Sequence, residues 1–395
     1  MNIRKTLSVF SVFVVILSAI AFSSCKTAAS QKAEIQPPEW NTNYKYVFVH
    51  GLAGWGHYDS QNSLFPYWGL VNGSLLKKLN KQGFDCYDAS VAPYGSAWDR
   101  ACELYAQLAG TVTDYGAAHS AKCGHARFGH DFSKEPLINQ WDEEHKINLI
   151  GHSFGGATVR LFAHLLENGS EEERNATTDG SLSPLFEGGH GGLIYSLTTL
   201  AAPHNGSSIY HIPADTEAKN NMQKLMSKAT NPQKDGRADF DYADFDMHIQ
   251  NADELNRKIK TISTAYYFSV PCSATQAAED GTQEPVPGLM EKLYQSSSVR
   301  MGTFEGRTPD GVLLGKEWQE NDGLVNTLSA RAPSHAPSAD FPAEKADARK
   351  LQKGLWYIMP VYKGDHMSLQ GGLTIENEIA SFYIDHLNMI NSLEE

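Results

Sequence analysis

The feature that most constrains this chain is a short apolar segment, Lys146 to Ile150, that runs directly into Gly151-His152-Ser153-Phe154-Gly155 and then into a helical pattern ending near Leu166. A strand that becomes a helix through Gly-x-Ser-x-Gly is typical of a nucleophile elbow. Small residues on both sides permit the tight, strained turn that lifts a serine hydroxyl off the sheet edge. The alternative is an ordinary glycine-rich turn. We favour the elbow because strand, motif and helix are contiguous.

Strand and helix patterns alternate along the rest of the chain. We predict strands at 46–49, 86–91, 146–150, 193–200, 266–270 and 356–361, and helices at 73–82, 98–108, 155–166 and 376–393. Such alternation favours an α/β fold with a mostly parallel central sheet flanked by helices. The stretch from Ala332 to Ala348 is rich in Pro, Ala and Ser and is predicted to be a surface loop.

A serine nucleophile needs a base, and in sheets of this kind an acid and then a histidine follow the serine along the chain. Asp322 lies in an Asn-Asp-Gly turn, and His366 lies just after a predicted strand. Loops at the carboxyl ends of strands carry the chemistry of such sheets, so we predict a triad of Ser153, Asp322 and His366. A surface turn and a solvated loop histidine are the alternatives. His335 and His386 are rival bases, but neither follows a strand.

The loop after the first predicted strand, His50-Gly51-Leu52, is a candidate for the oxyanion hole. The N–H groups of Leu52 and Phe154 would together hold the tetrahedral oxygen, each worth on the order of 3 kcal/mol of barrier. A simple strand-ending turn is the alternative. The same loop is rich in aromatic residues that could wall an acyl pocket, although core packing explains them equally well: Trp55, Tyr58, Phe65, Tyr67 and Trp68.

The N-terminus has the pattern of a targeting segment. Arg4 and Lys5 precede an apolar run from Leu7 to Phe22, which is followed by two serines and Cys25. The run is slightly short for a membrane span and suits a signal-peptide core. It resembles a bacterial lipoprotein leader, in which the cysteine becomes the lipidated first residue. The alternative is plain secretion after cleavage nearby.

The charge of the chain makes nucleic acid an unlikely partner, and its cysteine content argues against a scaffold held by many disulfides. The chain carries 33 basic and 46 acidic residues, a formal net charge of −13, which disfavours nucleic acid because the protein repels phosphate backbones. A neutral substrate fits better.

Four cysteines follow Cys25 and allow three pairings, among which the sequence does not choose: Cys86, Cys102, Cys123 and Cys272. We expect no bridge or one in a domain of this size.

Several longer blocks stand in the order found in one family. They are His50-Gly-Leu-Ala-Gly-Trp-Gly56, Trp98-Asp-Arg-Ala-Cys-Glu103, Asp114-Tyr-Gly-Ala-Ala-His119, Gly124-His-Ala-Arg-Phe-Gly129 and Ser183-Pro-Leu-Phe-Glu-Gly-Gly-His190. From about Tyr44 to the end, the chain resembles the zinc-containing thermoalkalophilic bacterial lipases, with staphylococcal lipases as relatives. The resemblance implies an α/β-hydrolase fold, hydrolysis of carboxylic esters, and Ser153, Asp322 and His366 as the triad.

The same resemblance implies a structural zinc ion held by two aspartates and two histidines. In this chain they fall on Asp99, His119, His125 and Asp246. Imidazole with carboxylate suits zinc, and four protein ligands leave no open position. Histidine spacing alone is a weak signal, since His130 and Cys123 are also nearby. Cys123 could instead be a free thiol or pair with Cys102.

The chain departs from the family at three places. Phe154 stands where glutamine is usual, but the donor there is a backbone N–H, so the chemistry would survive while the pocket changes shape. Ser368 stands where the family has an acidic calcium ligand, and Gln370-Gly-Gly-Leu-Thr lacks the family's Asp-Pro, so we do not expect calcium binding. The segment between Gly206 and Asp244 is shorter than the family's lid, so weaker interfacial activation is expected.

The sequence therefore predicts an exported serine lipase or esterase that cleaves acylglycerols or related carboxylic esters through an acyl-enzyme, at a membrane or lipid–water interface. The predicted organisation is a signal peptide at 1–24, a tether at 25–43 and an α/β-hydrolase domain at 44–395, with a zinc-site excursion at 97–135 and a lid region at 207–244. Two alternatives remain. A non-catalytic binding protein of the same fold would be expected to lack a triad member or an oxyanion glycine, and a serine hydrolase of another acyl bond, such as an amide, would share the triad.

Overall fold

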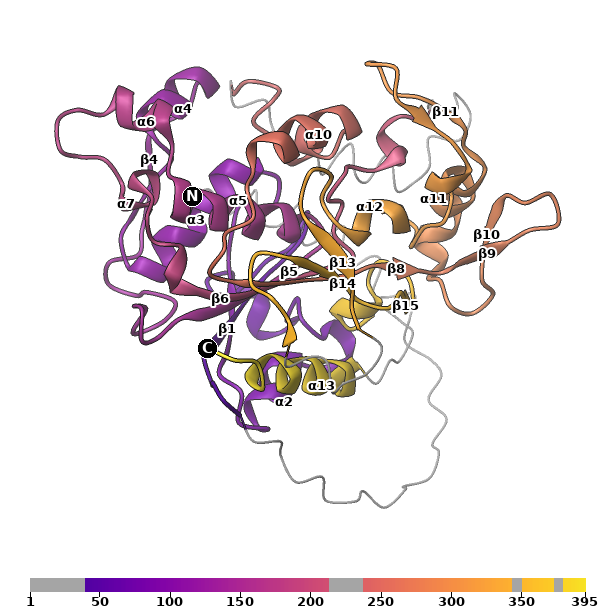
Figure 1. The fold of residues 1–395 in the computed structure, drawn as a ribbon, viewed down its shortest axis with the longest axis horizontal. Coiled ribbons are helices and arrows are strands. Elements are labelled where there is room, and N and C mark those ends of the chain that lie inside the picture. Colours follow the sequence, from indigo (N-terminus) through magenta and orange to yellow (C-terminus); the bar gives the residue numbers. More distant parts are fainter. Residues whose placement is uncertain (1–39, 213–236, 343–349, 373–378) are drawn as a thin grey trace. The chain divides into compact units, whose positions relative to one another are not determined.

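The computed structural model describes residues 40–212, 237–342, 350–372 and 379–395 (Figure 1). The predicted signal peptide, most of the predicted tether and most of the predicted lid region lie outside these residues. None of the helices in the described part of the chain combines the length and the apolar character needed to cross a bilayer.

A seven-stranded sheet forms the centre of the domain, and every neighbouring pair of its strands is parallel. In spatial order the strands are β13 (Ser338–Asp340), β14 (Trp356–Ile358), β7 (Tyr266–Val270), β6 (Ile194–Leu200), β5 (Ile147–His152), β1 (Lys45–Val49) and β2 (Cys86–Ala89). The prediction of a mostly parallel α/β sheet is confirmed. β5, which leads into the Gly-x-Ser-x-Gly motif, lies between β1 and β6.

Helices and short strand pairs surround this sheet. The helices are α2 (Leu75–Asn80), α3 (Ala97–Ala109), α4 (Ala117–Cys123), α5 (Phe154–Asn168), α6 (Glu171–Ala176), α7 (Pro184–Glu187), α9 (Ala243–Asp246), α10 (Ile249–Lys258), α11 (Lys292–Thr303), α12 (Thr327–Arg331) and α13 (Ile379–Asn391). The short pairs are β3 (Val112–Asp114) with β4 (Phe128–Asp131), β8 (Cys272–Ser273) with β15 (Tyr362–Lys363), β9 (Thr275–Ala277) with β10 (Gln283–Pro285), and β11 (Gly306–Arg307) with β12 (Leu313–Leu314).

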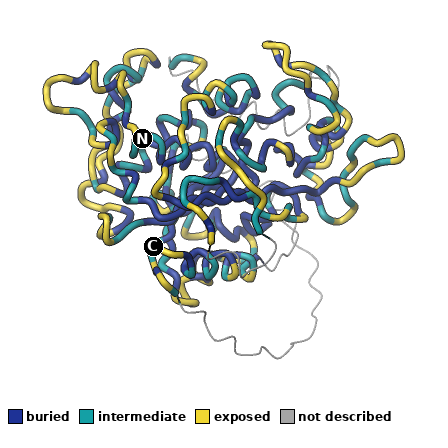
Figure 2. Tube along the Cα trace, in the orientation of Figure 1, coloured by how far each residue is buried: buried dark blue, intermediate teal, exposed yellow. Residues whose placement is uncertain are grey.

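Each face of the sheet carries its own apolar core. Side chains alternate along a strand, so Val47 and Val49 of β1 pack with α3 and α5 on one face, while Tyr46 and Phe48 pack with α2 and α13 on the other. Figure 1 shows α2 and α13 on the opposite side of the sheet from α3 and α5. The strands between them are buried along nearly their whole length (Figure 2). Two covered faces explain why these strands read as continuous apolar runs.

The turn between β5 and α5 places a non-glycine residue in a left-handed conformation. Ser153 has φ 54° and ψ −129°, a geometry that a side chain adopts only under strain. A Cβ at Gly151 would lie 2.5 Å from the Gly155 carbonyl oxygen, and one at Gly155 would lie 2.3 Å from the Val49 carbonyl oxygen. Gly151 is therefore required by the tightness of the turn itself, and Gly155 by its packing against β1.

The structure differs from the sequence expectations at the sheet edge. Residues 338–340, inside the predicted Pro/Ala/Ser surface loop, form the exposed edge strand β13. β14 is shorter than predicted and ends at Ile358, two residues before Pro360, which has no N–H to continue the ladder. The four cysteines of the described residues are all reduced and buried, so no pairing of Cys123 with Cys102 is present.

Candidate active site and metal cluster

The three residues predicted to form a triad meet above the carboxyl end of the sheet. His366 Nε2 lies 2.8 Å from Ser153 Oγ, and His366 Nδ1 lies 2.8 Å from Asp322 Oδ2. All three side chains are buried, with exposures of 7% for Ser153, 1% for Asp322 and 3% for His366. A carboxylate accepts only from a protonated nitrogen, so Nδ1 carries the hydrogen and Nε2 accepts from the serine hydroxyl.

Backbone groups orient the acid of this arrangement. Asp322 Oδ1 accepts the N–H groups of Leu324 at 3.0 Å and Val325 at 2.7 Å, which leaves Oδ2 for the imidazole. The His366 N–H also donates to the Asp322 carbonyl oxygen at 2.9 Å. The carboxylate and the histidine are therefore fixed to each other through both backbone and side chain.

The two residues predicted to supply the oxyanion donors, Leu52 and Phe154, lie on the segments next to Ser153. Phe154 opens α5, so its N–H is among the first-turn donors that have no acceptor within the helix. The Leu52 N–H donates to no protein acceptor in the described part of the chain. The loop carrying Leu52 approaches so closely that a Cβ at Gly51 would lie 2.7 Å from Ser153 Cβ. The Phe154 side chain is fully buried, with the Arg100 guanidinium 5.1 Å from its ring centre.

Buried polar side chains hold the loop from His50 to Leu52 in place. Val91 N–H donates to His50 Nε2 at 3.2 Å, so Nδ1 carries the hydrogen and donates to the Gly51 carbonyl at 2.8 Å. Arg100 Nη2 donates to the carbonyl oxygen of His50. The carbonyl groups of His50 and Gly51 are therefore both hydrogen-bonded, which restrains the backbone leading into Leu52.

A second chain of hydrogen bonds links this loop to the histidine of the triad. The Gly51 N–H donates to the Tyr67 hydroxyl at 3.1 Å, and that hydroxyl donates to His152 Nδ1 at 2.7 Å. His152 Nε2–H then donates to the His366 carbonyl at 2.8 Å. Sequence reasoning treated Tyr67 only as a possible pocket wall and His152 only as a variable position of the motif. No pattern in the sequence signals that the two side chains meet.

Both histidines of these networks are neutral. Burial, reinforced by the Arg100 charge, lowers the pKa of His50 to about 3. Burial also lowers the pKa of His152 to about 3, with a further contribution from His366. Each ring donates from one nitrogen and accepts at the other, which only the neutral form can do.

A second cluster of functional side chains lies in the segment from α3 to β4. His119 Nε2 is 3.1 Å from Asp99 Oδ1 and 3.3 Å from Asp241 Oδ1. His125 Nε2 is 3.6 Å from Asp99 Oδ1 and 3.4 Å from Asp241 Oδ2. Asp99 lies in the first turn of α3, His119 lies in α4, and Asp241 lies just before α9. Three of the four predicted zinc ligands are therefore brought together.

The fourth predicted ligand, Asp246, is corrected to Asp241. The Asp246 carboxylate accepts the Ala97 N–H at 2.8 Å, and burial raises its pKa to about 7. A backbone bridge between Gly95 and Tyr242 sets Asp241 beside the start of α3, where the Ser96 hydroxyl donates to Asp241 Oδ1 at 2.8 Å. Aspartates stand at 239, 241, 244 and 246. The sequence cannot show which of them reaches the histidines, because that depends on the backbone bridge between Gly95 and Tyr242, two residues far apart in the chain.

The donors of this cluster fit a metal ion. His125 Nδ1–H donates to the Ala126 carbonyl at 2.8 Å, which leaves the Nε2 lone pair facing the cluster. His125 Nε2 and Asp241 Oδ2 are both buried, and neither has a hydrogen-bond partner among the residues that the structure describes. Burial lowers the pKa of His119, but the hydrogen bonds that its ring donates to Asp241 and Asp99, together with their negative charges, outweigh burial and raise the pKa to about 9. The cluster thus attracts positive charge, and imidazole with carboxylate suits zinc.

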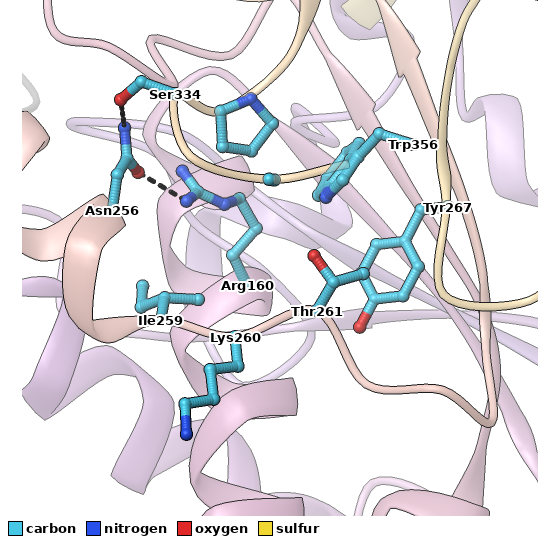
Figure 3. A pocket seen from close by; sticks show the side chains of 10 residues that line it. Arg160, Asn256, Ile259, Lys260, Thr261, Tyr267, Ser334 and Trp356 are labelled. Carbon is cyan, nitrogen blue, oxygen red and sulfur yellow. Dashed lines mark hydrogen bonds between the residues drawn. The ribbon is translucent and has the colours of Figure 1, made fainter. Parts of the chain in front are cut away.

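A separate small cavity lies beside α5, lined by side chains that include Arg160, Asn256 and Trp356 (Figure 3). Its volume is about 10 Å³, which is room for a single water molecule. Asn256 bridges Arg160 and Ser334 through hydrogen bonds. None of the lining residues belongs to the triad or the loop from His50 to Leu52, so this cavity is no substrate site.

Comparisons with known proteins agree with this geometry. The family described as "Lipase-like, C-terminal domain" matches residues 42–315. Lipase 2 of Staphylococcus aureus is 30% identical over 416 residues, covering 96% of this chain and 59% of the relative. The structure of EstA from Clostridium botulinum has a TM-score of 0.77 at 28% identity, covering 96% of this chain and 94% of that one. Staphylococcus hyicus lipase has a TM-score of 0.73 at 29% identity, covering 90% and 98%. The chain thus spans 59% of the length of its curated staphylococcal relative.

The neutral His152 makes a prediction about acid stability. Its folded pKa of about 3 lies below the unfolded value of 6.5, so below pH 6.5 the unfolded chain binds the extra proton and acid weakens the fold. The variant His152→Gln keeps a donor for the His366 carbonyl and removes this titration. Between pH 6.5 and 4.5 its unfolding free energy should fall less steeply than that of the wild type, by up to about 1.4 kcal/mol per pH unit.

Urea unfolding at half-unit pH steps measures both slopes. The range from pH 7.5 to 8.5, where the ring is neutral folded and unfolded, is the internal control and should give parallel curves. Curves that stay parallel down to pH 4.5 would show that His152 is protonated in the folded protein.

Proposed function

The chain belongs to the family of lipase-like C-terminal domains, and from this premise we propose that it is an exported serine hydrolase that cleaves carboxylic esters of acylglycerols and related lipids. The observation that carries the proposal is the position of His366, whose two ring nitrogens lie 2.8 Å from a serine hydroxyl and 2.8 Å from a buried carboxylate. The relatives that are named lipases support the same reaction class.

In this proposal Ser153 Oγ attacks the ester carbonyl while His366 Nε2 takes its proton. The tetrahedral intermediate collapses to an acyl-enzyme, and the imidazolium returns the proton to the leaving alcohol. Water then attacks the acyl carbonyl while His366 takes its proton, and the imidazolium returns that proton to Ser153 Oγ as the fatty acid leaves. Asp322 holds the ring orientation and stabilises the imidazolium without accepting its proton.

The negative charge that develops on the carbonyl oxygen is held by the N–H groups of Leu52 and Phe154. Each such donor is worth on the order of 3 kcal/mol of barrier. The dipole of α5 adds to this because the oxygen forms at the helix N-terminus. Strain at Ser153 and the fixed carbonyl groups of the opposing loop keep these donors in position before substrate arrives, so little reorganisation is needed during the reaction.

The two alternatives share parts of this geometry. An amide hydrolase would use the same triad and oxyanion donors, and a non-catalytic binding protein would use the fold alone. Ester hydrolysis is preferred because the relatives are named for it and because a net charge of −13 favours a neutral substrate.

We further propose a structural zinc ion held by Asp99, His119, His125 and Asp241. The ion would join the first turn of α3, helix α4 with the residues just after it, and the segment before α9. Four protein ligands are typical of a structural rather than a catalytic site. When bound, zinc supplies folding free energy, and the reaction proceeds through this chain's own triad.

The first prediction concerns the nucleophile. Ser153→Ala should fold normally and lose at least about 10⁴-fold in kcat on p-nitrophenyl esters and tributyrin, because no other group can form the acyl-enzyme. Ser133→Ala, an exposed serine, is the matched control and should keep wild-type turnover. A parallel panel of amides separates amidase activity. Wild-type ester turnover in Ser153→Ala would disprove the assignment, and a wild type inactive on every acyl substrate would favour a binding protein.

The second prediction concerns the metal. Purified protein should contain about one zinc per chain, and chelation should lower the melting temperature before it changes turnover of the remaining folded enzyme. Asp241→Asn should weaken zinc affinity at least about tenfold, the lower bound for losing even an outer-shell partner. Asp246→Asn is the control, because its amide oxygen can still accept the Ala97 N–H. Equal affinity in both variants would refute the corrected ligand set.

The third prediction concerns the exported form. We propose that the leader is removed and that Cys25 carries lipid, with two or more acyl chains giving a stable membrane anchor. Mass spectrometry of the mature N-terminus should find a lipidated Cys25, and Cys25→Ser should release the protein from the membrane fraction. An unmodified N-terminus at another residue would mean plain secretion.

A further inference from the structure

Arg160, in the middle of α5, is a buried cation whose hydrogen-bond acceptors are all neutral. Only 4% of the residue is exposed. Nη1 donates to His204 Nδ1 at 3.3 Å, and Nη2 donates to the amide oxygen of Asn256. The imidazole of His204 is neutral too, because burial and the nearby Arg160 charge hold its pKa well below the usual value. Arg160 Nε is buried and has no hydrogen-bond partner among the described residues.

The positive charge of Arg160 is not balanced by a carboxylate. Burial lowers the pKa of Arg160 to about 9, and no carboxylate of the described residues opposes this shift, so the guanidinium stays protonated at neutral pH. Asp253 is linked to the same network through the Ser334 hydroxyl at 3.3 Å. Its carboxylate is already paired, however, with His335 at 2.8 Å and with Arg257 at 2.9 Å. A buried charge without a counterion is costly, so a negative partner is expected beside Arg160.

The cavity beside α5 offers the place for that partner, because Arg160 lines it together with other hydrogen-bond donors (Figure 3). The Tyr267 hydroxyl accepts the Ile262 N–H at 3.1 Å, which leaves its own hydrogen without an acceptor in the described part of the chain. The Trp356 indole N–H and the Thr261 hydroxyl likewise donate to none of the described residues. The residues that line the cavity include no aspartate and no glutamate. The space is thus surrounded by donors and positive charge, as an anion requires.

We propose that this cavity binds one small monovalent anion of the size of chloride. The guanidinium of Arg160 supplies the positive charge, and its unpartnered Nε–H supplies a charge-assisted hydrogen bond. The cavity volume of about 10 Å³ admits a single water-sized particle, which excludes sulfate, phosphate and carboxylate ligands. Water fits the same space, but it leaves the charge of Arg160 unbalanced. Lys260, an exposed residue of the lining, adds to the attraction for anions.

The bound anion joins segments that are distant in the sequence. Arg160 belongs to α5, Thr261 lies between α10 and β7, and Trp356 belongs to β14. A ligand that binds only the folded chain stabilises it, and the stabilisation grows with ligand concentration once that exceeds Kd. Binding forms no covalent bond and transfers no proton or electron. The inference depends neither on ester hydrolysis nor on the zinc site.

Bromide tests the position of the anion, because it can replace chloride and its anomalous scattering distinguishes it from water. The mature wild-type protein is purified without chloride and crystallised with sodium bromide. An anomalous peak is expected in the cavity, within hydrogen-bond reach of Arg160 Nε. Electron density there without anomalous signal would show that the cavity holds water, and this would overturn the proposal. This measurement needs no variant.

Thermal unfolding in solution tests whether chloride binds outside a crystal. Sodium chloride replaces sodium gluconate, whose anion is too large for the cavity, at constant total salt. The melting temperature of the wild type should rise by several degrees when chloride reaches about 100 times Kd. Arg160→Met, which keeps the apolar stem and removes the charge, should lose this rise. Arg307→Met, which removes an exposed arginine of β11, should keep it.

The other outcomes contradict the proposal. Equal melting temperatures of the wild type in the two salts would overturn it, and a bromide peak found together with that result would mean binding at crystal concentration only. A chloride effect of the same size in Arg160→Met would show that chloride acts elsewhere. If Arg160→Met does not fold, the bromide crystals and the wild-type melting curves still decide. Ester turnover and zinc content, measured on the same samples, report on the other proposals separately.

Discussion

The active-site region depends on the close approach of backbone segments at the end of β5. A Cβ at Gly155 would lie 2.3 Å from the Val49 carbonyl, and one at Gly51 would lie 2.7 Å from Ser153 Cβ. No side chain fits at either position, so the nucleophile, the helix N-terminus and the opposing loop are brought within hydrogen-bond reach of one point. The strained φ of 54° at Ser153 persists because β5 is paired on both sides and α5 packs against the sheet.

This backbone arrangement leaves polar backbone groups in the protein interior. The buried histidines around it supply the hydrogen bonds that those groups need. His50 and His152 each join two backbone or hydroxyl groups, and both are neutral because burial opposes their protonation. His119 has the opposite environment, since two carboxylates favour positive charge on it. The same residue type is therefore neutral beneath the triad and favours positive charge beside the two carboxylates, and the burial and neighbouring charges decide which.

The sequence predicted those features that local pattern encodes. The periodicity of apolar residues, the placement of glycines and the alternation of elements along the chain predicted β5, the elbow, α5 and the parallel sheet. The family resemblance strengthened the assignment of Asp322 and His366 to the triad. Asp241 was missed because four aspartates lie within eight residues. Only the backbone bridge between Gly95 and Tyr242 determines which of them lies beside the histidines. The link from Tyr67 through His152 was missed for a related reason, since it joins residues 85 positions apart. Contacts of this kind are set by tertiary packing, which no short window of sequence records.

Helix α3 couples the two regions, because adjacent residues in its first turn serve different sites. Asp99 contacts both histidines of the metal cluster. Arg100 donates to the carbonyl oxygens of His50 and Ala92 and to the Thr158 hydroxyl of α5. A helix moves as a nearly rigid unit, so any displacement of Asp99 also moves the guanidinium that fixes the loop from His50 to Leu52. If the proposed structural ion binds here, it would influence the proposed reaction without touching substrate, because it would hold in place the helix whose Arg100 fixes the loop from His50 to Leu52.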